Sequence, residues 1–135
     1  MERKEEKRMV KALVVDDQPA VLRLVSKLLN RFGVETIETS DAESALLAYL
    51  EENPDIVFSD FVMPGMDVTT FYRALKAIKE DLPIVMFTGY LEQMMAKMKE
   101  LEIEPDYVLE KPFQEDDILP ILRERFPDAK FNAGP

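Results

Sequence analysis

Short apolar segments alternate with amphipathic segments along the chain, and this alternation limits the possible folds more than any other feature. The apolar runs rich in β-favouring residues predict five strands, at residues 11–15, 34–38, 55–59, 83–87 and 106–110. A helix after each strand is typical of a parallel sheet covered on both faces by right-handed crossovers. The first, third and fourth runs are apolar almost throughout, as central strands of such a sheet should be.

Helical periodicity predicts five helices. Four are expected at residues 19–32, 41–51, 91–101 and 114–126, and the third in chain order begins at Thr69 or Thr70 and ends near residue 80. Pro19 suits the first turn of its helix, where the missing N–H costs little, and Gly33 ends that helix. Asp41 is predicted to cap the second helix. Pro120 is expected to interrupt or restart the last one.

Length and composition fit one globular domain, because 135 residues of which 47% are hydrophobic can bury a core. We expect residues 1–8 to be a charged extension, residues 9–126 the domain and residues 127–135 a tail. No apolar run approaches the roughly 20 residues that span a bilayer, and the N-terminus is charged rather than signal-like. The expectation is a cytoplasmic protein that does not contact a membrane.

Charge and two absent residue types exclude several functions. The formal charge of -10, from 17 basic and 27 acidic residues, argues against direct nucleic-acid binding through a basic face. Without cysteine the chain has neither disulfides nor thiolate metal ligands. Without histidine it has no imidazole base, and any phosphohistidine in its chemistry has to come from another molecule.

Polar residues directly follow four of the predicted strands. They are Asp16 and Asp17 after the first, Asp60 after the third, Thr88 after the fourth and Lys111 after the fifth. The carboxyl ends of parallel strands meet at one edge, where ligands bind. Three carboxylates there would repel one another, and a hard cation such as Mg²⁺ would compensate. A carboxylate nucleophile beside Mg²⁺, a hydroxyl and a lysine are suited to phosphoryl transfer onto aspartate.

The motifs around these residues resemble the signature of receiver domains of two-component response regulators. In chain order they are Val14-Val15-Asp16-Asp17, Asp60-Phe61-Val62-Met63-Pro64-Gly65-Met66-Asp67, Thr88-Gly89 and Lys111-Pro112-Phe113. The resemblance spans nearly the whole chain and is closest to the single-domain chemotaxis or phosphorelay type. It implies an α/β, flavodoxin-like (βα)5 three-layer sandwich with a parallel sheet of order 2-1-3-4-5.

The resemblance also implies a role for each site residue. Asp60 would be the phosphoacceptor, while Thr88 and Lys111 would hold the phosphoryl oxygens. The implied Mg²⁺ ligands are Asp16, largely through water, Asp17, Asp60 and the backbone carbonyl of Val62. The bond between Lys111 and Pro112 is commonly cis in the family.

The implied function is a signalling domain that catalyses its own phosphorylation and slow dephosphorylation, and is not otherwise an enzyme. A histidine kinase or a phosphotransfer protein would be the phosphodonor, and an unknown output protein would respond. By analogy with receivers that dock on kinase helices, the contact candidates are Val21, Leu24, Pro112 and Phe113.

Three positions depart from the family pattern. Val68 follows Asp67 where a glycine is usual, and Gly89 replaces the more frequent alanine after the switch hydroxyl. Val108 occupies the position of the aromatic switch residue, and Tyr107 lies one residue early. Because side chains alternate along a strand, Tyr107 is predicted to point to the other face and cannot substitute.

Alternative interpretations remain for the separate residues and for the whole site. Taken singly, Asp16, Asp17 and Thr88 are ordinary helix caps, and Lys111 is an ordinary surface amine. A haloacid-dehalogenase-type hydrolase uses similar groups, but its nucleophile follows the first strand in an Asp-x-Asp pattern, and this chain has no room for a cap domain. A pseudo-receiver is disfavoured because all five positions are filled, and nucleotide binding because no phosphate-binding glycine motif is present.

Overall fold

The computed structural model describes residues 9–62 and 66–132, so Met63, Pro64 and Gly65 of the long acidic motif lie outside the described residues. The strands are β1 (Lys11–Val15), β2 (Glu35–Thr39), β3 (Ile56–Asp60), β4 (Ile84–Thr88) and β5 (Tyr107–Glu110). The helices are α2 (Pro19–Arg31), α3 (Ala42–Glu52), α4 (Val68–Ile78), α5 (Leu91–Glu100) and α6 (Glu115–Arg125). No helix among the described residues is long and apolar enough to cross a membrane.

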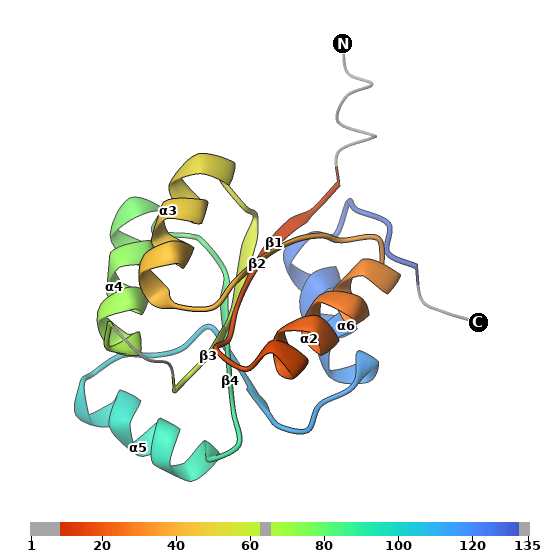
Figure 1. The fold of residues 1–135 in the computed structure, drawn as a ribbon. Coiled ribbons are helices and arrows are strands. Elements are labelled where there is room, and N and C mark those ends of the chain that lie inside the picture. Colours follow the sequence, from red (N-terminus) through yellow and green to blue (C-terminus); the bar gives the residue numbers. More distant parts are fainter. Residues whose placement is uncertain (1–8, 63–65, 133–135) are drawn as a thin grey trace.

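The strands form one parallel sheet in the order β2-β1-β3-β4-β5, so the predicted flavodoxin-like fold is confirmed. Helices α2 and α6 cover one face of the sheet, and α3, α4 and α5 cover the other (Figure 1). Successive residues of the central strands pack into two separate hydrophobic cores, one on each face of the sheet. Leu13 and Val57 face α3, α4 and α5, whereas Val14 and Phe58 face α2 and α6. With both faces covered, the open edge at the carboxyl ends of the strands is where ligands can reach.

Four of the five strands, β2 to β5, begin one residue later than the sequence predicts, and for β4 and β5 the physical reason can be identified. Pro83 has no N–H to donate to a ladder, and β4 therefore begins at Ile84. Asp106 does not belong to β5, which begins at Tyr107. Its side chain makes tertiary contacts instead: Oδ2 accepts from the Ile84 N–H at 3.0 Å and from Lys76 Nζ at 2.6 Å. At the other end β3 continues through Asp60, which pairs with Phe87 despite its charge.

The predicted interruption at Pro120 is wrong, because α6 runs without a break from Glu115 to Arg125. Ile118, Ile121 and Leu122 are buried on both sides of the proline and hold the helix on the sheet. Pro120 itself is exposed, so water can satisfy the carbonyl that its missing N–H leaves free. Helix α4 begins earlier than predicted, at Val68, because Asp67 caps it by accepting from the Thr69 N–H at 3.0 Å.

Part of the predicted C-terminal tail packs on the domain. Ala129 and Phe131 lie against the core under α2 and α6. The Asn132 N–H donates to the Phe32 carbonyl at 3.0 Å, which ties this segment to the end of α2. Gly33 follows there with φ +90°, a conformation that favours glycine.

Candidate functional site

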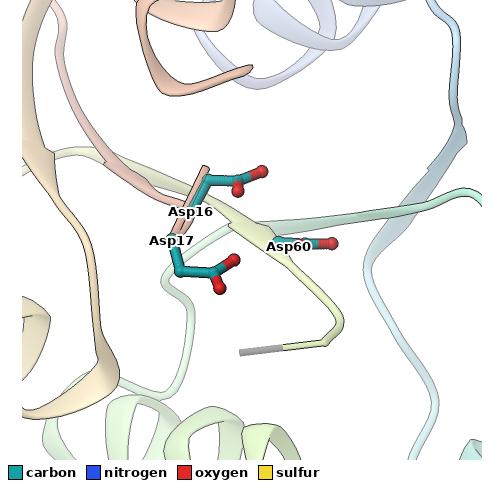
Figure 2. Close-up of side chains that lie close together, drawn as sticks. All are labelled: Asp16, Asp17 and Asp60. Atoms are coloured by element: carbon teal, nitrogen blue, oxygen red, sulfur yellow. The ribbon is translucent and has the colours of Figure 1, made fainter. Parts of the chain in front are cut away.

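Three carboxylates meet at the carboxyl edge of the sheet. Asp16 and Asp17 come directly after β1, and Asp60 is the last residue of β3. Figure 2 shows the three side chains projecting into the same space from these two neighbouring strands. One oxygen of each lies within 4.8 Å of the others, a spacing at which a single metal ion can be held.

The buried environment of Asp16 is the strongest indication of a cation site in this cluster. Its side chain is fully buried, and Oδ1 accepts from the Gln18 N–H at 2.8 Å. The other oxygen, Oδ2, has no hydrogen-bond partner among the described residues. A buried carboxylate oxygen that accepts no hydrogen bond is costly; the Lys111 ammonium 3.6 Å away offsets part of that cost, and a bound cation would offset more. Asp17 is exposed beside it, so one side of the cluster is open to solvent.

Asp60 is 6% exposed, and its surroundings raise its pKa above that of a free aspartate. Burial raises the pKa of Asp60, and the neighbouring charge of Asp16 raises it further. The Lys111 ammonium and the Val62 backbone N–H act in the opposite direction on this pKa without cancelling the rise. A cation at the cluster would favour the charged, nucleophilic form.

Lys111 and Thr88 lie at the same edge of the sheet as the three carboxylates. Lys111 Nζ lies 3.4 Å from Asp60 Oδ1 and 3.6 Å from Asp16 Oδ2. The Lys111 N–H donates to the Thr88 carbonyl at 2.7 Å, and the bond from Lys111 to Pro112 is cis. Thr88 is buried, and its Oγ1 accepts from the Tyr90 N–H at 2.9 Å. The five residues singled out in the sequence therefore lie together, as the strand pattern predicts.

These groups line an open pocket of about 420 Å³. Its lining consists of Asp17, Gln18, Asp60, Val62, Thr88, Gly89, Tyr90 and Lys111. Val62 and Tyr90 are 62% and 66% exposed and flank its entrance, one on each loop. The pocket thus presents carboxylates, a hydroxyl and one ammonium to a small ligand, between an aliphatic and an aromatic side chain.

The docking candidates are only partly brought together. Leu24 and Phe113 line one groove of about 380 Å³ between α2 and the start of α6, together with Leu28. Pro112 is exposed directly before Phe113. Val21 is half-buried and packs on the core, which leaves it less available for contact than the sequence suggests.

The sequence analysis missed one residue that contacts the site. Phe87 lies under the Lys111 ammonium, but in the sequence it is indistinguishable from the other apolar residues of its strand.

Comparison with known proteins agrees with this geometry. The family model described as "Response regulator receiver domain" matches residues 12–123. The chain is 31% identical over 118 residues to sporulation initiation phosphotransferase F of Bacillus subtilis, covering 87% of this chain and 94% of that protein. It is 33% identical over 108 residues to the B. subtilis alkaline phosphatase synthesis transcriptional regulatory protein PhoP, with 80% of this chain but only 45% of that protein covered.

Solved structures show the same similarity. The chemotaxis response regulator CheY4 of Vibrio cholerae superimposes with a TM-score of 0.77 at 27% identity, covering 88% of this chain and all (100%) of that one. A receiver domain protein from Clostridium thermocellum gives the same TM-score of 0.77 at 25% identity, with 88% and 95% covered.

Proposed function

The chain belongs to the receiver-domain family of two-component response regulators, and we propose that it switches partner binding by accepting a phosphoryl group on Asp60. Asp60 is the only one of the three clustered acids that ends a central strand with Lys111 3.4 Å away and with Thr88 lining the same pocket. This arrangement, with a nucleophile between an ammonium and a hydroxyl, is the observation that carries the proposal.

The reaction takes a phosphoryl group from a phosphohistidine of a histidine kinase or a phosphotransfer protein. Since this chain has no histidine, that phosphohistidine lies on another molecule. A carboxylate oxygen of Asp60 attacks phosphorus, an O–P bond forms and the donor's N–P bond breaks. The electron pair of that bond stays on the imidazole nitrogen. Lys111 and Thr88 hold the phosphoryl oxygens as their charge rises, so the domain catalyses its own modification by positioning.

We assign Mg²⁺ to the acidic cluster, with Asp17, Asp60 and the Val62 carbonyl as direct ligands and Asp16 acting largely through water. The support is the all-oxygen donor set and the buried Oδ2 of Asp16, which accepts no hydrogen bond from the described residues. When bound, the ion neutralises charge on the phosphoryl oxygens and on the nucleophile. The residues present therefore fit the metal that the family implies.

The proposal extends to partners and location. The donor docks through the groove at Leu24 and Phe113. Val21 and Pro112 are the two further contact candidates from the sequence. The output partner is a protein, and neither nucleic acid nor a membrane is contacted directly, in keeping with the charge of -10. We place this signalling in the cytoplasm.

The test is labelling by acetyl phosphate in the presence of Mg²⁺, followed by intact mass. The wild-type chain should gain one phosphoryl group, and Asp60→Asn should gain none because the amide keeps the shape but is not a nucleophile. Asp67→Asn is the matched control: it changes an acid of the same motif whose role is to cap α4, and asparagine caps equally well. Full labelling of Asp60→Asn, or equal loss in both variants, would refute the assignment.

A further inference from the structure

The Lys111 ammonium has an aromatic neighbour in addition to the two carboxylates. Its Nζ lies 5.3 Å from the centroid of the Phe87 ring, within the range of a cation–π interaction. Phe87 is completely buried on β4, directly before Thr88. Among the described residues, Lys111 is the only cation over this ring.

An aromatic ring suits a lysine that has to bind incoming oxygens. The electron-rich face attracts the ammonium as a whole and does not require a lone pair aimed at one N–H. A lysine has three N–H donors, and the contact with the ring face uses none of them, so the ring adds to the hold on the ammonium without competing with oxygen acceptors. Because Phe87 is shielded from water, the low local dielectric also strengthens the attraction between its ring and the ammonium.

The ring itself is held firmly relative to the nucleophile. Phe87 pairs with Asp60 in the sheet, and its carbonyl accepts from the Phe61 N–H at 2.9 Å. The Phe87 ring also contacts the ring of Phe113, with centroids 5.5 Å apart and planes tilted by 57°. The ring is thus fixed to the strand of the acceptor and to the loop that carries the lysine.

We propose that Phe87 is a positioning residue, whose ring face holds the Lys111 ammonium at the phosphoryl-accepting edge beside Asp60. This inference rests on the proposed function, since it explains how one group of that site is placed. Phe87 touches neither substrate nor metal; it acts through Lys111.

The rate of labelling by acetyl phosphate and Mg²⁺ tests the ring's electronic role. Fluorinated phenylalanines placed at position 87 of the full chain withdraw density from the ring face while nearly preserving its shape. The rate should fall stepwise with each added fluorine, and Phe87→Leu should be about tenfold slower than wild type. A rate that is constant across the series, or that follows the unfolding temperature instead of the fluorine count, would overturn the proposal.

Two further measurements separate positioning from packing. Phe58→Leu removes a buried ring from the same core, over which no cation lies in the described structure, and should leave the labelling rate unchanged. The ε-methylene protons of Lys111 should be shifted upfield by the Phe87 ring in wild type and return to ordinary values in Phe87→Leu. Unshifted protons in wild type would overturn the inference whether or not the chain is labelled. Failure of wild type to label would instead refute the proposed function.

Discussion

Tyr107 and Val108 are neighbours on β5 that pack on opposite faces of the sheet. Tyr107 lies on the side of α2 and α6, where its hydroxyl donates to Glu124 at 2.7 Å and Arg125 lies over its ring. Val108 packs on the other side, against the core of α3, α4 and α5. The prediction from strand alternation is confirmed, and Tyr107 cannot act as an aromatic switch on the α5 side.

The first prediction is therefore a conformational change centred on α5. If Thr88 moves to a phosphoryl group, its hydrogen bond from the Tyr90 N–H at 2.9 Å breaks, and Tyr90, Met94 and Met95 take up the change. Beryllofluoride with Mg²⁺ should shift the amide resonances of these residues strongly and those around Tyr107 weakly. The opposite pattern, with Tyr107 leaving Glu124 and α5 unchanged, would contradict this. A third outcome, an α5 that already samples the active form without phosphate, would show as small shifts everywhere.

A second prediction is slow loss of the phosphoryl group. Hydrolysis needs an oriented water, and Val62 and Tyr90, which flank the pocket entrance, offer neither a carboxylate nor an amide to hold one. The phosphoryl lifetime should be minutes or longer, and Val62→Asn should shorten it about tenfold by supplying an amide. Val62→Ala is the matched control, which removes bulk without adding a polar group. A wild-type lifetime of seconds, measured by the decay of the labelled mass, would count against this explanation.

Metal affinity provides a third prediction, because the two adjacent acids differ in role. Asp17 is exposed and aimed at the cluster, whereas Asp16 is buried and also holds the Gln18 N–H. Asp17→Ala should weaken Mg²⁺ binding by about tenfold or more, and Asp16→Ala should weaken it less. Isothermal titration of each variant with Mg²⁺ measures both. Equal losses would remove the distinction between a direct ligand and one that acts through water.

The fourth prediction concerns stability in metal-free buffer. Burial and Asp16 raise the pKa of Asp60 above its unfolded value, so the stability linked to its protonation is present below the unfolded pKa and lost as pH rises through the folded pKa. At neutral pH Asp60→Asn should therefore unfold at a higher urea concentration than wild type. The difference should shrink as pH falls and Asp60 takes up its proton. A variant less stable than wild type at neutral pH in EDTA would contradict this sign.

The alternation of strands and helices was sufficient to predict a parallel sheet and the convergence of the acids, because strand ends fix where side chains emerge. The order of the strands followed from the family resemblance and not from the pattern itself. Details that depend on tertiary contacts were not predictable. Pro120 was misjudged because the burial of Ile118 and Ile121 outweighs one lost hydrogen bond. Phe87 lies on β4 and Lys111 directly follows β5, so their contact joins residues far apart in the sequence, and no local pattern reports such a contact.

The most direct test of the account is to locate the acyl phosphate on the chain. Borohydride reduces an aspartyl phosphate to homoserine, which marks the modified position permanently for peptide mass spectrometry. After labelling by acetyl phosphate with Mg²⁺, homoserine should appear at position 60 and should be absent when EDTA replaces the metal. Homoserine at Asp16, Asp17 or Asp67, or at position 60 equally with and without Mg²⁺, would contradict the claim that Asp60 is the metal-assisted phosphoacceptor.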